Sequence, residues 1–322
     1  MTRLLDPELI PSTLWKAESK TVLLPPELSL AYQALIKRRG LAELAESRDP
    51  KNPPIGGLDQ KRTDEHFARA FDGSVARTQL ALLDPNREVH GTSNAFITCL
   101  AGNNVSLTDA PCGAGAAAFA FLASVAELRA QSVLPREPLD VVLIGGELSQ
   151  PARAYAEEML AEIRSSLEAQ AIFVEAEFLS WDVTCSGSNT DLVRRVTLAS
   201  AGTPKRLLVV ANFNGFLEKE KKRKEAQPQI EELFRHASGD NSVAIWIEPD
   251  MNRATADGGL FSWLRSLLKG PLRLFAKENH DEDDLAPKPI YTSSAQFRLP
   301  LNPSETARVR LAVMSINLVR SK

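Results

Sequence analysis

Short apolar runs alternate with segments of helical periodicity along most of the chain. The apolar runs that predict strands lie at 105–109, 139–147, 171–179, 206–212 and 242–248. Runs of this kind are typical of strands buried on both faces, and alternation with helices favours a parallel sheet covered on both sides. Two further strands, at 291–299 and 307–319, are joined by a Pro-rich turn. We therefore expect an α/β, doubly wound, mostly parallel sheet that ends in an antiparallel hairpin.

The first 90 residues show a different pattern. Apolar positions at helical spacing occur within 27–39 and 63–83, and prolines interrupt the rest. We expect an N-terminal helical cap or substrate region over 1–90, followed by a Rossmann-like domain over 91–322. Such a cap would help to choose the substrate, and His66 within it is a candidate catalytic base.

The segment after the first strand carries the most informative residues. The strand ends in Asp109, Pro111 opens a turn that contains Gly113 and Gly115, and an Ala-rich helix follows. Glycines let the backbone approach a ligand closely, and the first turn of a helix offers unpaired N–H groups. A nucleotide-like cofactor would fit this loop, although a plain glycine turn between a strand and a helix has the same pattern.

Polar residues also follow the later strands. The second ends in Glu147-Leu148-Ser149, the third in Asp182-Val183, and the fourth in Asn212-Phe213-Asn214. A carboxylate at such an end can accept two vicinal hydroxyl donors, but an acid before a helix also suits the helix dipole. A run of five basic and three acidic residues follows at 218–225 and indicates either a solvated face or a site for RNA phosphates.

Composition narrows the classes of function. A net charge of -3 and a pI near 5.9 give no global signature of nucleic-acid binding. Three cysteines without metal-ligand spacing and four histidines indicate neither a structural metal nor a disulfide framework. The sequence has no apolar run of 18 residues, so we expect no membrane segment and a cytoplasmic location.

The motif Asp109-x-Pro111-Cys112-Gly113-x-Gly115, with the later strand ends, resembles class I S-adenosylmethionine-dependent methyltransferases. The resemblance implies a seven-stranded sheet whose last strand inserts antiparallel between the fifth and the sixth. It also implies cofactor-binding residues, namely Asp109, Pro111, Gly113, Gly115, Glu147, Asp182 and Val183. In that family the first acid holds the amino-acid end of the cofactor, the second its ribose, and the third its adenine.

The resemblance implies transfer of a methyl group from S-adenosylmethionine to an acceptor that the sequence does not identify, with RNA favoured because of the basic run. Asn212 and Asn214 are the candidate catalytic residues, since strand four ends beside the reacting methyl in the family. Two alternatives stay open. One is an inactive methyltransferase-like binding or assembly module, and the other is a nicotinamide-dependent Rossmann oxidoreductase, whose fingerprint the glycine loop also satisfies.

Overall fold

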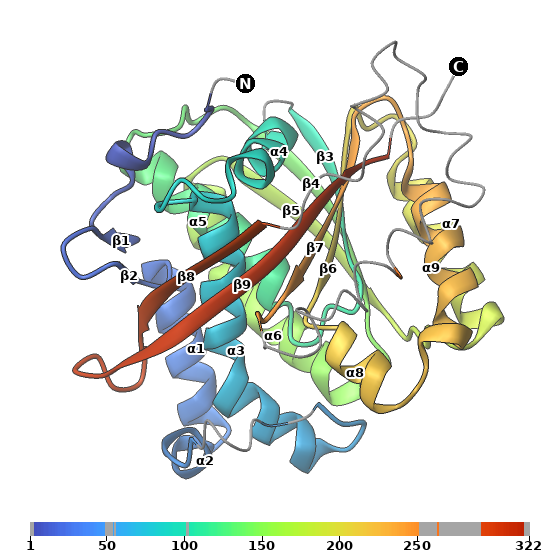
Figure 1. The fold of residues 1–322 in the computed structure, drawn as a ribbon, viewed down its shortest axis with the longest axis horizontal. Helices are drawn as coiled ribbons and strands as arrows, with labels where there is room; N and C mark the ends of the chain where they lie inside the picture. The colour runs from blue at the N-terminus through green and yellow to red at the C-terminus, as the bar shows by residue number, and fades with distance from the viewer. Residues whose placement is uncertain are drawn as a thin grey trace.

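A single mixed sheet organises the molecule (Figure 1). The computed structural model describes residues 3–48, 54, 56–100, 103–250, 263 and 291–318. Within these residues the sheet has nine strands in the order β1-β2-β8-β9-β7-β6-β3-β4-β5. The strands are β1 (Trp15–Lys16), β2 (Thr21–Val22), β3 (Asn104–Asp109), β4 (Leu139–Gly146), β5 (Ile172–Leu179), β6 (Lys205–Ala211), β7 (Ser242–Glu248), β8 (Tyr291–Arg298) and β9 (Thr306–Asn317).

The strand directions confirm the expected class of fold. Strands β3 to β7 pair in parallel, and β9 lies antiparallel between β7 and β8. These seven strands have the order and the inserted last strand of the class I methyltransferase fold. The expected total of seven was wrong, however, because β1 and β2 extend the sheet beyond β8. Each is two residues long, too short to give a periodic signal in a segment that we expected to be helical.

Helices cover both faces of the sheet (Figure 1). Within the described residues they are α1 (Pro26–Arg38), α2 (Ala42–Glu46), α3 (Gln60–Leu83), α4 (His90–Leu100), α5 (Ala116–Ala130), α6 (Gln150–Ala169), α7 (Ser186–Ala199), α8 (Asn214–Lys219) and α9 (Arg223–Ala237), with a short 3-10 turn at Pro7–Leu9. Successive side chains along a strand point to opposite faces of the sheet. In β6, Leu207 and Val209 pack towards α1 and α3 to α6, whereas Leu208 and Val210 pack towards α7 and α9.

The alanine content of α5 follows from its position. This helix packs against α3, α6, α1 and the sheet, and nearly all its residues are buried. A helix that is apolar all round belongs inside a protein, and small side chains let its neighbours approach closely. Helix α5 therefore holds the loop after β3 on a rigid support.

The N-terminal helices share this core. Helix α3 lies along β8 and β9 (Figure 1), and Phe67 on it stacks on Tyr155 of α6 with ring centroids 4.4 Å apart. Farther along α3, the fully buried Asp72 forms an ion pair with Arg48 at 2.5 Å. Burial raises the pKa of Asp72, and the charge of Arg48 opposes that shift. The division of roles at residue 90 stays a prediction.

Candidate functional site

The register of the sheet brings the carboxyl ends of its central strands to one level. Asp109 at the end of β3 lies opposite Gly145 of β4 and Val209 of β6. On the next pairs, Gly146 of β4 lies opposite Leu179 of β5, and Ala211 of β6 lies opposite Ile247 of β7. Ligands of open α/β sheets bind at this edge, where the strand order reverses between β3 and its neighbours.

The loop between β3 and α5 needs glycine at two positions for different reasons. Gly115 has a φ of +80°, and a Cβ there would lie 2.1 Å from the ring of Phe119. Gly113 has a φ of +53°, but no atom lies within 4 Å of a Cβ built on it. Gly115 is thus fixed by packing, whereas Gly113 borders open space that a ligand could fill. Pro111 follows a cis peptide bond at the start of the turn.

Asp109 is fully buried, and only one of its two carboxylate oxygens has a hydrogen-bond partner. Its Oδ2 accepts a hydrogen bond from the N–H of Ala118 at 3.2 Å, whereas its Oδ1 is buried without a partner. Burial raises the pKa of Asp109 to about 7, and the nearby charge of Glu147 contributes to the rise. A buried carboxylate oxygen without a donor is costly, so this atom is suited to a cationic or N–H group supplied by a ligand.

Glu147, directly after β4, joins two strand ends. Its Oε2 accepts from the N–H of Gly113 at 3.1 Å, and its Oε1 accepts from the N–H of Ser149 at 2.8 Å. Burial raises the pKa of Glu147, and these two backbone donors oppose the shift. A carboxylate offers about four acceptor positions, so each oxygen keeps one for a further donor such as a hydroxyl.

Helix α3 reaches this part of the site. Ser149 caps α6 by accepting from the N–H of Ala152, and its hydroxyl also lies 3.1 Å from the hydroxyl of Thr63 on α3. Burial lowers the pKa of the nearby His66, which favours its neutral form. The first turns of α3 therefore lie against the strand end that carries Glu147.

The loop after β5 contains two predicted site residues, Asp182 and Val183, in different environments. Asp182 is partly exposed, and its Oδ1 accepts from both the N–H and the hydroxyl of Thr184, at 2.8 and 2.7 Å. Val183 is 4% exposed and belongs to the core, together with Trp181. The N–H of Trp181 donates to the carbonyl of Glu147, so this loop lies beside the end of β4.

The turn after β6, residues 212–214 (the β6 turn), forms a separate polar cluster. Asn212 has a φ of +55°, a conformation that asparagine tolerates better than most residues. Glu248 of β7 is 3% exposed, and its Oε1 accepts from the N–H groups of Phe213 and Asn214 and from the indole of Trp246, at 3.0, 2.8 and 2.7 Å. Burial raises the pKa of Glu248 to about 7.

Both candidate catalytic amides are engaged by arginines. The Oδ1 of Asn212 accepts from Arg77 of α3 at 2.5 Å, and its Nδ2 donates to Ser74 at 3.2 Å. The Oδ1 of Asn214 accepts twice from Arg223, at 3.2 and 2.6 Å. Burial lowers the pKa of Arg77 to about 10, and Glu248 opposes the shift.

The structure thus groups the sequence-derived candidates into two clusters. Asp109, Gly113 and Glu147 meet around the β3 and β4 ends, with Asp182 alongside, whereas the two asparagines belong to the β6 turn. Sequence reasoning missed Arg77, and it included Arg223 only as part of the basic run at 218–225 without its contact with Asn214. The acid at the end of β7 was visible as Glu248-Pro249, but nothing near Arg77 signals its contact with a residue 135 positions later.

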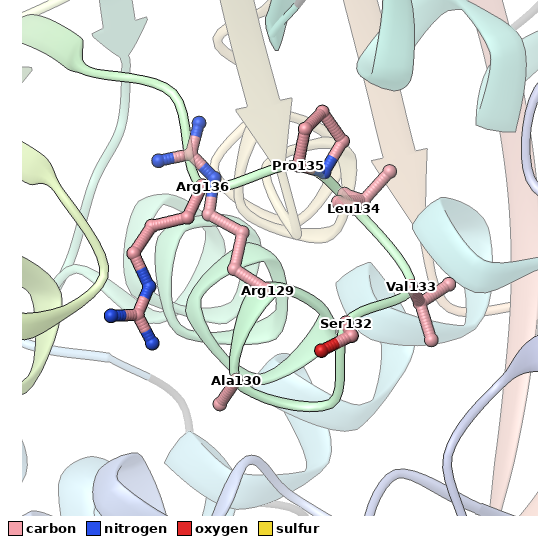
Figure 2. A pocket seen from close by; sticks show the side chains of 7 residues that line it. All are labelled: Arg129, Ala130, Ser132, Val133, Leu134, Pro135 and Arg136. Atoms are coloured by element: carbon pink, nitrogen blue, oxygen red, sulfur yellow. The ribbon is translucent and has the colours of Figure 1, made fainter.

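A surface hollow of about 540 Å³ lies elsewhere (Figure 2). Its lining side chains come from the end of α5 and the loop that leads to β4, including Arg129 and Arg136. That loop is at the amino edge of the sheet, opposite the strand ends described above. Arg129 uses its Nη1 to donate to the carbonyls of Gln170 and Ala171, which gives it a structural role. We place the site at the carboxyl edge.

Within the described part of the chain, no group of three or more His, Cys, Asp and Glu side chains is arranged to hold a metal ion. A membrane-crossing helix is likewise absent from the described residues, because none of these helices is both long and apolar enough.

Comparison with known proteins gives little direct guidance. No family model matches the sequence, and no curated protein matches it. Among solved structures, the chain is similar to a protein from Listeria monocytogenes that is provisionally described as a class I S-adenosylmethionine-dependent methyltransferase. The identity is 14%, the match covers 93% of this chain and 88% of that one, and the TM-score is 0.35. A likeness at this level carries no functional argument, and the strand order defines the fold instead.

Proposed function

We propose that this chain binds S-adenosylmethionine at the carboxyl ends of β3 and β4 and transfers its methyl group to an acceptor held near the β6 turn. The observation that carries the proposal is the buried Oδ1 of Asp109, which has no partner and lies at the end of β3, just before the loop in which Gly113 borders open space. An unpaired carboxylate oxygen and an open glycine fit a cofactor that has an ammonium group.

The remaining cofactor contacts follow from the acceptor positions. Glu147 would take the two ribose hydroxyls with the positions left on its oxygens, and its backbone bonds to Gly113 and Ser149 would hold it in place. Asp182 would accept from the adenine amino group, with Val183 packed behind it. Pro111 and Gly115 would shape the loop.

The cofactor would supply an electrophilic methyl group on a sulfonium, and methyl transfer proceeds by in-line displacement, so the protein's main task is positioning. The β6 turn suits that task because Glu248 fixes its backbone and Arg77 and Ser74 fix the side chain of Asn212. Asn212 would orient the acceptor with the lone pair that Arg77 leaves on its Oδ1, whereas Asn214 has already accepted two donors there.

We propose RNA as the acceptor and the cytoplasm as the location. The basic run at 218–225 forms the end of α8 and the start of α9, directly after the β6 turn. The hydrogen bond and charge of Glu225 chiefly raise the pKa of Lys222, and the charge of Asp182 adds to the rise, so this run also lies near the third strand end. All three cysteines are free thiols, which agrees with a reducing compartment.

One observation favours a second candidate, a cofactor-binding module without catalysis. The amide oxygens of Asn212 and Asn214 are occupied by guanidinium groups rather than presented free. In that case the protein would bind S-adenosylhomocysteine but would transfer no methyl group to any acceptor.

Calorimetric titration with S-adenosylhomocysteine tests the cofactor site, with NADH titrated in parallel. We expect saturable binding of the adenosyl ligand alone, at least tenfold weaker in Glu147→Ala and unchanged in Glu175→Ala, whose carboxylate is exposed on the edge strand β5. Binding of NADH alone would support the oxidoreductase, and equal binding by both variants would refute the assignment of Glu147. Incorporation of labelled methyl into cellular RNA then separates an enzyme from a binding module.

A further inference from the structure

An aromatic ring stands exposed beside the β6 turn. Phe216 of α8 is 42% exposed, and its ring stacks on that of Phe213 with centroids 5.8 Å apart and planes inclined by 7°. Phe213 is buried and contacts Trp181 and Trp246, with ring centroids 5.9 and 6.5 Å away. The inner face of Phe216 is therefore supported by ordered rings, and its outer face is available to a ligand.

The same short helix carries basic side chains. Lys219 is three residues after Phe216 on α8, so the two share one side of the helix. Two basic residues of the run at 218–225 are paired with acids, whereas Lys219, Lys221 and Lys224 are exposed and make no ion pair within the described residues. An open aromatic face next to unpaired lysines is complementary to a ligand that combines a flat ring with a negative charge.

We propose that Phe216 is a stacking platform for an unpaired base of a single-stranded RNA, and that Lys219 and Lys221 bind the flanking phosphates. Stacking on an aromatic side chain requires a base whose face is free, and loops and ends of RNA present such bases, whereas a duplex covers both faces with its neighbours. This inference rests on the proposed function, because it makes the RNA strand the acceptor held beside the β6 turn.

Fluorescence anisotropy of a labelled 12-nucleotide RNA, without cofactor, tests the platform. We expect Phe216→Ala to weaken binding about tenfold and Phe216→Tyr to retain it within about twofold, because tyrosine keeps the ring. Phe173→Ala is the matched control, since Phe173 is also an exposed phenylalanine, at 47%, but lies on the edge strand β5. Lys219→Ala should lower the slope of log affinity against log salt by about one.

Binding of duplex RNA and single-stranded DNA, together with the affinity of Phe216→Ala, gives the results that would overturn the inference. Equal affinity for the same sequence as a duplex, tighter binding of the single-stranded DNA, or an unchanged affinity of Phe216→Ala each refutes it. A wild-type protein that binds no RNA but methylates protein refutes it as well. Calorimetry with S-adenosylhomocysteine keeps the two proposals apart, because Phe216→Ala should leave cofactor affinity intact. Cofactor binding without RNA binding defeats this inference and the choice of RNA as acceptor but leaves the proposed cofactor site standing, whereas RNA binding without cofactor binding defeats the proposed methyl transfer.

Discussion

Replacing Asp109 by asparagine should stabilise the protein and weaken its binding of the cofactor. Asp109 is fully buried, and its pKa rises from an ordinary value of 3.8 to about 7 in the folded chain. Its ionisation therefore opposes folding, and the penalty grows between pH 4 and 7 and stays constant above that. Three pKa units correspond to about 4 kcal/mol.

The expected gain is smaller than that figure. In Asp109→Asn the amide oxygen can accept from the N–H of Ala118, but the NH₂ group then occupies the position where Oδ1 has no partner. An unsatisfied buried donor costs about 1–3 kcal/mol, which leaves a net stabilisation of about 2 kcal/mol at pH 8. For a chain of this size we expect the melting temperature to rise by about 3 °C.

Thermal unfolding at pH 5 and pH 8, with calorimetric titration of S-adenosylhomocysteine, measures both effects. The stabilisation should disappear at pH 5, where Asp109 is protonated in the folded wild type, and the affinity should fall at least tenfold at pH 8. Asp191→Asn, an exposed acid on α7, is the control and should change neither quantity. An equal shift in melting temperature at both pH values, or an unchanged affinity, would refute the reasoning.

Three further substitutions test other parts of the structure. Gly113→Ala should lower the free energy of unfolding by about 1 kcal/mol because of its positive φ, and it should abolish binding of S-adenosylhomocysteine in calorimetry. The control, Gly202→Ala, also has a positive φ and open surroundings, so it should lose the same stability but keep the binding. Glu248→Gln should lower methyl transfer about tenfold without changing cofactor affinity, because the β6 turn loses its charged acceptor, and equal loss of both would contradict this. Arg48→Met should destabilise the chain by about 3 kcal/mol in urea denaturation at pH 8 and by less at pH 5, where the stranded Asp72 is more often protonated; a loss that does not depend on pH would disagree.

Much of the fold could be predicted because its central strands carry short, largely apolar runs that alternate with helical segments. The runs before Asp109 and Glu147 are buried on both faces, and each ends in a polar residue at the same edge of the sheet. The two added strands could not be predicted in this way. Trp15–Lys16 and Thr21–Val22 form strands only because β8 offers a free edge, which is a tertiary effect.

The candidate site likewise contains contacts that the sequence could predict and contacts that it could not. The bond between Gly113 and Glu147 could be anticipated, since adjacent parallel strands bring their ends together. The contact of Arg77 with Asn212 joins a helix in the N-terminal region to a turn 135 residues away, and only the packing of α3 along β8 and β9 creates it. The assignments of the site residues to cofactor and acceptor stay predictions.

The position of β9 determines when the sheet can be completed during synthesis. The last described strand occupies an interior place, between β7 and β8, and Thr21 near the start of the chain pairs with Gln296 near its end. Contacts this distant in sequence form slowly, and the growing chain must keep the segment around Thr21 unpaired until β8 and β9 have left the ribosome. We expect loss of the final strand to prevent closure of the sheet, whereas loss of the first two strands would leave the edge of β8 open to other chains.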